Sequence, residues 1–173
     1  MVASLGRDPV SAEQFLKANA DVARVPGLAV YLTRQSGVIP TALPQGLKHN
    51  HILHEFVLLL TIETGLSPRV PQGQRLVFEE IAPGMGKAVL TFGFFDEPNV
   101  PVALRSLPTG WRHETDDTSY VVGQLIAIRG SHSAMYRWRG ALFRIMLRLS
   151  GSATEYFRLP PGRVIELGNE VEI

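Results

Sequence analysis

The chain has 173 residues, of which 45% are hydrophobic and 19% are charged, so it is long enough for one domain with a buried core and too apolar for a disordered chain. Lys and Arg number 17 and Asp and Glu 16, a formal net charge of +1, which lacks the basic excess typical of a nucleic-acid-binding protein. The absence of cysteine excludes disulfides, thiolate catalysis and cysteine-based metal centres.

Residues 1–24 are predicted to be a loose lead-in that carries one short helix. Ser11 is placed to cap a helix from Ala12 to about Asn19. This stretch has no apolar core of the kind that a signal peptide needs. The best apolar run of the chain, Phe56 to Ile62, is much shorter than the about 20 residues of a membrane-spanning helix. We therefore expect a soluble chain whose main domain covers residues 25–173.

The next segment predicts a parallel strand–helix–strand unit. We expect a break in the chain at Arg24–Gly27, followed by a strand from Leu28 to Thr33 and a helix from Leu43 to Leu53. Phe56 to Ile62 then forms a nearly continuous apolar run, which is typical of a strand covered on both faces. This run is expected at the centre of a sheet, parallel to the first strand.

Two antiparallel strands are predicted next, over Gln74–Ile81 and Lys87–Phe95. Their connection, Ala82 to Gly86, is short and rich in glycine, which favours a hairpin. The string Gly84-Met85-Gly86 is similar to part of a phosphate-binding loop, but the Lys-Ser/Thr pair and the following helix of such a loop are missing. A hairpin turn is therefore expected here.

The remaining chain predicts two helices and two strands. A short helix is expected over Val100–Leu107, and a strand over Thr118–Ile128 with a bulge at Gly123. The longest helix is expected over Ser133–Leu149, where apolar residues spaced by three and four form one stripe. Val164–Ile173 ends the chain as an edge strand or hairpin. The whole pattern predicts an α/β domain with a mixed parallel and antiparallel sheet of five or six strands and packed helices.

The densest polar segment surrounds three histidines after the predicted helix start. His51 and His54 would lie one turn apart on a helix, a spacing that can present two imidazoles to a metal ion. A third ligand does not share that face, so no metal site is predicted. The alternative is that these residues close the helix and connect it to the next strand. The ligand-binding candidates from this segment are Lys48, His49, Asn50, His54 and Glu55.

A second group of candidate ligand-binding residues lies on the polar face of the predicted long helix. It consists of Arg137, Arg144 and Arg148. Such a face can meet phosphates or anionic headgroups, although a solvated outer face is the ordinary interpretation of this pattern.

Catalytic groups do not gather in the sequence. Glu79 and Glu80 are neighbours on a predicted strand and point to opposite faces. Asp116 and Asp117 fall in a loop, and no Gly-x-Ser-x-Gly elbow occurs. We therefore predict neither an enzyme nor a cofactor.

Three longer strings carry a family resemblance. They read Val25-Pro26-Gly27-Leu28-Ala29-Val30-Tyr31-Leu32-Thr33, then Leu47-Lys48-His49-Asn50-His51-Ile52-Leu53-His54-Glu55, and finally Phe157-Arg158-Leu159-Pro160-Pro161. In this order they resemble the C-terminal cytosolic domain of bacterial Kup-type potassium transporters, the Kup/HAK/KT family. The resemblance runs from about Val25 to Ile173.

The resemblance implies a domain on the cytoplasmic side of the bacterial inner membrane. Its partner would be the membrane part of the same transporter, which imports potassium together with protons and lies outside this chain. Its work would be regulation, folding or dimerisation of the transporter, with a homodimer as one assembly. Two alternatives remain open: a nucleotide-sensing module whose arginines hold phosphates, and a small hydrolase built on His49, His51, His54 and Glu55.

Overall fold

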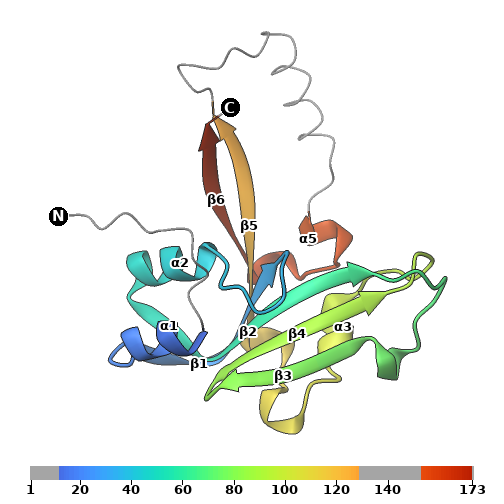
Figure 1. The fold of residues 1–173 in the computed structure, drawn as a ribbon, viewed down its shortest axis with the longest axis horizontal. Coiled ribbons are helices and arrows are strands. Elements are labelled where there is room, and N and C mark those ends of the chain that lie inside the picture. The colour runs from blue at the N-terminus through green and yellow to red at the C-terminus, as the bar shows by residue number, and fades with distance from the viewer. Residues whose placement is uncertain (1–11, 129–152, 173) are drawn as a thin grey trace.

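The fold is a single six-stranded sheet with helices on both faces (Figure 1). The computed structural model describes residues 12–128 and 153–172. The sheet has the order β3-β4-β2-β1-β5-β6, in which β3 and β4 are antiparallel and the other neighbours are parallel. Its strands are β1 (Ala23–Thr33), β2 (Ile52–Thr64), β3 (Leu76–Ala82), β4 (Met85–Phe92), β5 (Thr118–Ile128) and β6 (Val164–Glu172). The predicted mixed α/β sheet is confirmed.

Four α-helices accompany the strands in the described part of the chain. They are α1 (Ala12–Ala18), α2 (Ala42–Asn50), α3 (Val100–Leu104) and α5 (Ala153–Tyr156). Short 3₁₀ turns at Thr109–Trp111 and Thr115–Asp117 lie between α3 and β5. No helix among the described residues is long and apolar enough to cross a membrane.

Strand β2 lies inside the sheet, as its apolar sequence predicts. It is flanked by β1 and β4, and residues Val57 to Leu60 are each no more than 1% exposed. Both faces of such a strand are covered, so successive residues are all apolar and do not alternate with polar ones. The unit β1–α2–β2 has the expected parallel pairing.

Alternate residues of the central strands supply two separate cores, one on each face of the sheet. Helix α3 covers one of them through Val100 and Leu104. Helices α1 and α2 cover the other through Phe15 and Leu43. The first core also contains Leu28, Val30, Leu58, Leu60, Leu90, Trp111 and Tyr120. The second also contains Ala29, Tyr31, Leu53, Val57, Leu59, Met85 and Val121.

The predicted break at Arg24–Gly27 is wrong, because β1 runs through it. The strand begins at Ala23 and its pairing with β2 shifts register between Val25 and Leu28. A proline has no N–H for the sheet ladder, and Gly27 takes the positive φ of 102°. The Pro-Gly pair therefore makes a bulge inside the strand and does not end it.

The helix predicted over Leu43–Leu53 ends three residues early. His51 adopts a left-handed conformation with a φ of 56°, and its N–H donates to the carbonyl of Leu47 over 2.9 Å. This is a helix-ending cap in which a non-glycine residue occupies the usual glycine position. Ile52 and Leu53 then start β2, where they pair with β1. Similarly, α3 ends at Leu104 and not at Leu107.

The C-terminal elements agree with the sequence in part. Strand β6 lies at the sheet edge, as predicted. The bulge predicted at Gly123 is wrong, because the β5–β6 register continues through it without a shift. The long helix predicted over Ser133–Leu149 lies outside the described residues.

Candidate functional site

The structure separates the candidate residues of the polar segment after α2. Lys48, His49 and Asn50 are exposed at the end of that helix. His54 and Glu55 belong to β2, where the first is half-buried and the second is exposed. The predicted one-turn spacing of His51 and His54 is therefore wrong, since the helix ends at Asn50, before both of them. No group of three His, Asp or Glu among the described residues is arranged to hold a metal ion.

This segment makes backbone contacts that stabilise the fold. The carbonyl of His54 accepts a hydrogen bond from Arg24 Nη1 over 3.1 Å, and burial lowers the pKa of the His54 imidazole. A Cβ added at Gly84 would lie 2.5 Å from the carbonyl oxygen of Glu55, and Val57 N donates to Gly84 O over 2.9 Å. The segment thus connects α2 to β2 and anchors the β3–β4 hairpin. A ligand role for its side chains stays a prediction.

The arginine candidates Arg137, Arg144 and Arg148 lie outside the described residues. They stay a prediction as well.

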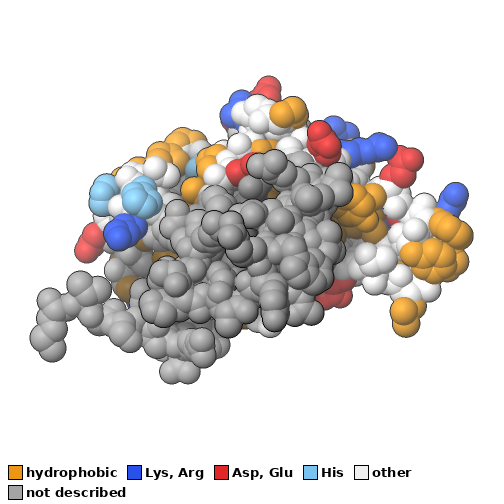
Figure 2. All heavy atoms as spheres, turned by 90° about the horizontal axis from the view of Figure 1, so that it is seen from above, with side chains coloured by type: hydrophobic (Ala, Val, Ile, Leu, Met, Phe, Trp, Pro, Cys, Tyr) orange, Lys and Arg blue, Asp and Glu red, His pale blue; other side chains and the backbone are white. Residues whose placement is uncertain are grey.

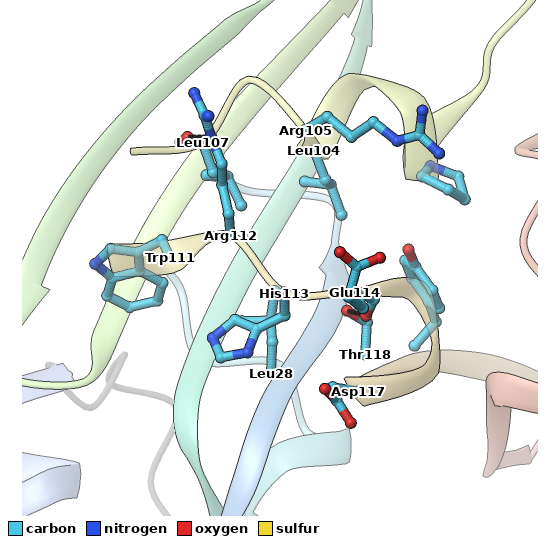
Figure 3. Close-up of a pocket in the computed structure, with 12 residues that line it drawn as sticks. Leu28, Leu104, Arg105, Leu107, Trp111, Arg112, His113, Glu114, Asp117 and Thr118 are labelled. Carbon is cyan, nitrogen blue, oxygen red and sulfur yellow. Dashed lines mark hydrogen bonds between the residues drawn. The ribbon is translucent and has the colours of Figure 1, made fainter. Parts of the chain in front are cut away.

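A pocket of about 500 Å³ lies between α3 and the loop that leads into β5 (Figure 3). Buried side chains of Leu28, Leu104 and Tyr120 line its apolar side. The lining also includes four exposed charged residues: Arg105, Arg112, Glu114 and Asp117. No local sequence pattern marks this pocket, because its parts come from β1, α3, β5 and the loop before β5.

An aromatic cluster forms the wall beneath this pocket. Trp111 is 5% exposed. The centroid of its ring lies 5.1 Å from the ring centroid of Phe56 and 5.0 Å from that of Phe78. The His113 ring lies 5.0 Å from that of Phe56. His113 Nε2 is buried and has no hydrogen-bond partner among the described residues. The cluster therefore presents one unpaired imidazole nitrogen, which can donate or accept a hydrogen bond depending on its tautomer.

Hydrogen bonds within the loop hold the pocket in shape. Arg112 Nε donates to Leu107 O over 2.6 Å, and Thr118 Oγ1 donates to Glu114 O over 2.9 Å. Burial raises the pKa of Tyr120 to about 12, so its hydroxyl stays neutral at physiological pH. The pocket joins charges of both signs to an apolar floor. The Thr118 hydroxyl in its lining donates to a backbone carbonyl and His113 Nε2 has no partner among the described residues, which differs from the hydrogen-bonded nucleophile and base of a catalytic triad.

Two glycines lie where this region approaches the sheet backbone. A Cβ at Gly27 would lie 2.5 Å from the carbonyl oxygen of Asp117. A Cβ at Gly86 would lie 2.6 Å from the Phe78 ring and 3.1 Å from the Trp111 ring. Each glycine allows a distant part of the chain to approach the sheet backbone, which a single sequence does not reveal.

Comparisons with known proteins point to one family. The model for the K+ potassium transporter C-terminal domain matches residues 26–173. The Bradyrhizobium sp. (strain BTAi1) protein named probable potassium transport system protein Kup 3 is 43% identical over 151 residues, which are 87% of this chain and 24% of that protein. The corresponding Kup protein of Zymomonas mobilis is 41% identical over 157 residues, 90% of this chain and 24% of the relative.

Another relative extends the similarity over almost the whole chain. The Aromatoleum aromaticum protein named probable potassium transport system protein Kup is 39% identical over 172 residues, 98% of this chain and 27% of the relative. The chain therefore spans about a quarter of the length of these relatives. No solved structure matches the chain.

Proposed function

This chain belongs to the K+ potassium transporter C-terminal domain family, and from that membership we propose that it is the cytoplasmic regulatory or assembly domain of a bacterial potassium uptake transporter. The observation that carries the proposal is the family match over residues 26–173, which contains β2 to β6 and most of β1. The family is one of transporter domains and not an enzyme family. Transport itself, and its coupling to protons, would belong to the rest of a longer protein.

The architecture suits a domain that acts through its surfaces. A sheet with a packed hydrophobic core on each face is a rigid domain. Because it is rigid, its binding to one conformation of a partner protein can stabilise that conformation. In this proposal the first partner is the membrane part of the same transporter, and a second copy of the domain is the other. Neither the nucleotide-sensing nor the hydrolase hypothesis gains a supporting observation, since His49, His51 and His54 do not converge and the arginine face lies outside the described residues.

The experiment that tests this proposal exchanges domains in a relative. The matching C-terminal quarter of the Zymomonas mobilis protein is deleted, or replaced by residues 26–173 of this chain. Rubidium uptake and the amount of transporter in the membrane are then measured in cells that lack other potassium uptake systems. We expect the deletion to lower uptake, membrane abundance or the response to external potassium, and the chimera to restore them.

A chimera with Leu58→Asp is the matched control, because Leu58 is fully buried in β2 and an unpaired carboxylate there prevents folding of the domain. This control should behave as the deletion does. Unchanged uptake, abundance and regulation after deletion would show that the proposal is wrong.

A further inference from the structure

Three exposed apolar side chains gather where β2 and β4 end. Leu66 is 100% exposed, Phe94 53% and Phe95 71%, and the two phenyl rings lie 4.8 Å apart. Figure 2 shows hydrophobic side chains at this end of the molecule, on the right of the view. We call Leu66, Phe94 and Phe95 the aromatic tip. Exposed large apolar side chains that lie close together at a surface are candidates for an interaction site.

The loops that carry the aromatic tip are tied to each other through their backbones. Phe94 N donates to Ser67 O over 3.2 Å, and Phe95 N donates to Pro68 O over 2.8 Å. Gly93 lies directly against the backbone of Pro68 and Arg69, where a Cβ has no room. The two loops therefore form one unit that holds the rings outward.

The carboxylate of Asp96 links the two loops through hydrogen bonds. Asp96 Oδ2 accepts hydrogen bonds from Val70 N over 2.9 Å and from Gly93 N over 2.8 Å. Its Oδ1 lies 2.8 Å from Arg75 Nη2, and Arg75 Nε donates to Val70 O over 2.7 Å. Because polar contacts fix the loops, the apolar side chains of the tip are not used to hold the fold together.

The charges around the tip leave one cation without an ion pair. Asp96 is paired with Arg75, and Glu97 is paired with Arg158. Arg69 is exposed and lines a hollow of about 520 Å³ together with Phe95. It forms no ion pair with a described residue, although it lies close enough to Asp96 to help lower the pKa of that carboxyl. The tip thus combines apolar rings with an exposed guanidinium that makes no close ion pair with a described residue.

We propose that the aromatic tip and Arg69 dock on the anionic lipid surface of the membrane, an inference that rests on the proposed function. The chain spans about a quarter of its relatives' length, and the proposed membrane part would hold the domain close to a bilayer. Phe and Leu side chains enter the headgroup boundary of a bilayer, and Arg is attracted to anionic headgroups. Such tethering makes a small insertion effective, because the local lipid concentration is high.

The size and shape of the tip favour lipid over protein as the occupant. Three side chains offer at most a few hundred Å² of exposed surface, whereas a stable protein interface buries roughly 800 Å² on each partner. The rings project from loop ends, and the hollow that Phe95 borders is lined mostly by polar and charged residues, so it offers no apolar groove for a partner's side chain. A bilayer accepts projecting rings without a complementary surface.

Vesicle co-sedimentation tests this inference with the 173-residue chain. Vesicles of phosphatidylcholine alone are compared with vesicles that also contain phosphatidylglycerol. We expect binding to the anionic vesicles, a loss of about tenfold or more in the partition coefficient for the double variant Phe94→Ser/Phe95→Ser, and a smaller loss for Arg69→Gln that high salt reproduces. Ile165→Ser is the matched control, because Ile165 is 46% exposed on β6 at the far side of the sheet. It should bind as the unaltered chain does.

Several results would overturn the inference. They are failure of the unaltered chain to bind anionic vesicles at millimolar lipid, equal binding by the double variant, and a dimer in sedimentation velocity that only the tip substitutions dissociate. Circular dichroism of each variant establishes that it is folded.

Uptake measurements in the chimeric transporter separate this inference from the proposed function. If deletion of the domain changes transport but the tip substitutions change neither transport nor vesicle binding, the docking surface is wrong and the proposed function stands. If deletion has no effect, the proposed function fails, whereas vesicle binding still reports on the tip.

Discussion

Aromatic side chains sit at both ends of β2 and β4, and the two ends use them in opposite ways. At the amino ends, Phe56, Phe78 and Trp111 pack ring against ring beneath the pocket, and Trp111 is 5% exposed. At the carboxyl ends, Phe94 and Phe95 contact each other but remain 53% and 71% exposed. One group of rings fills a core, and the other is presented to the outside.

This difference distinguishes aromatic residues that stabilise the fold from aromatic residues that are available for binding a partner. The amino-end rings stabilise the fold through buried area and ring contacts. The carboxyl-end loops are stabilised by backbone hydrogen bonds and by Asp96 with Arg75, so their rings are not needed for stability. Substitutions at the two ends should therefore have very different effects on the free energy of unfolding.

The largest effect is expected from Trp111→Ala at the amino ends. Removing this buried ring leaves a cavity against Phe56 and Phe78 and should lower the free energy of unfolding by about 3–5 kcal/mol. Urea denaturation followed by circular dichroism measures the change. A loss below about 1 kcal/mol would show that the cluster is not a structural core.

Gly27→Ala should follow, with a loss of about 2 kcal/mol, because an alanine at a φ of 102° is strained. Its Cβ would also lie 2.5 Å from the carbonyl oxygen of Asp117. Gly73→Ala is the matched control, since nothing lies within 4 Å of a Cβ there. Equal stability of the two variants in urea denaturation would contradict the close approach of β1 to the loop before β5.

Asp96→Asn tests whether the Asp96 carboxylate stabilises the loops at the carboxyl ends, through the pH dependence of the free energy of unfolding. Hydrogen bonds from Val70 and Gly93, with the Arg75 guanidinium, hold the pKa of Asp96 below its ordinary value of 3.8. A carboxyl with a lowered pKa in the folded state adds stability above its unfolded pKa and loses it as pH falls through the folded pKa. The variant should therefore be less stable than the unaltered chain near pH 7, and the gap should close below about pH 4.

The measurement for Asp96 is urea denaturation at a series of pH values. Glu80→Gln serves as the control, because Glu80 is exposed and no ion pair to it occurs among the described residues. A gap that stays the same for Asp96→Asn at every pH would mean that the carboxylate charge does not fasten the loops.

Phe95→Ala should have the smallest effect on stability, within about 0.5 kcal/mol, as is usual for an exposed side chain. Together with Trp111→Ala, this variant compares the contributions of the amino-end and carboxyl-end aromatic residues to the free energy of unfolding. A loss above about 1.5 kcal/mol in the same urea assay would show that the aromatic tip belongs to the fold, and an outward docking role would then lose its support.

The sequence predicted the elements that depend on local patterns. The apolar run of β2 and the glycine-rich β3–β4 turn were both identified correctly, because burial on two faces and a tight hairpin leave direct marks on neighbouring residues. The family strings identified the family that the match over residues 26–173 shows.

The errors share a cause in pairing between distant strands. The end of α2 at Asn50 and the start of β1 at Ala23 depend on the pairing of Ile52 with Ala23, which no local signal encodes. The helical spacing expected for His51 and His54 is wrong for the same reason, since His54 lies in β2.

The sequence by itself therefore determined the composition of the core strands, the fold class and the family. The tertiary structure decided which side chains meet: the pocket beside Trp111 is lined by residues of β1, α3, β5 and the loop before β5, and the aromatic tip joins the loops after β2 and β4. The physical reason is that hydrophobic periodicity is a property of one segment, whereas a site on this sheet is assembled from several segments by hydrogen bonds and close backbone contacts.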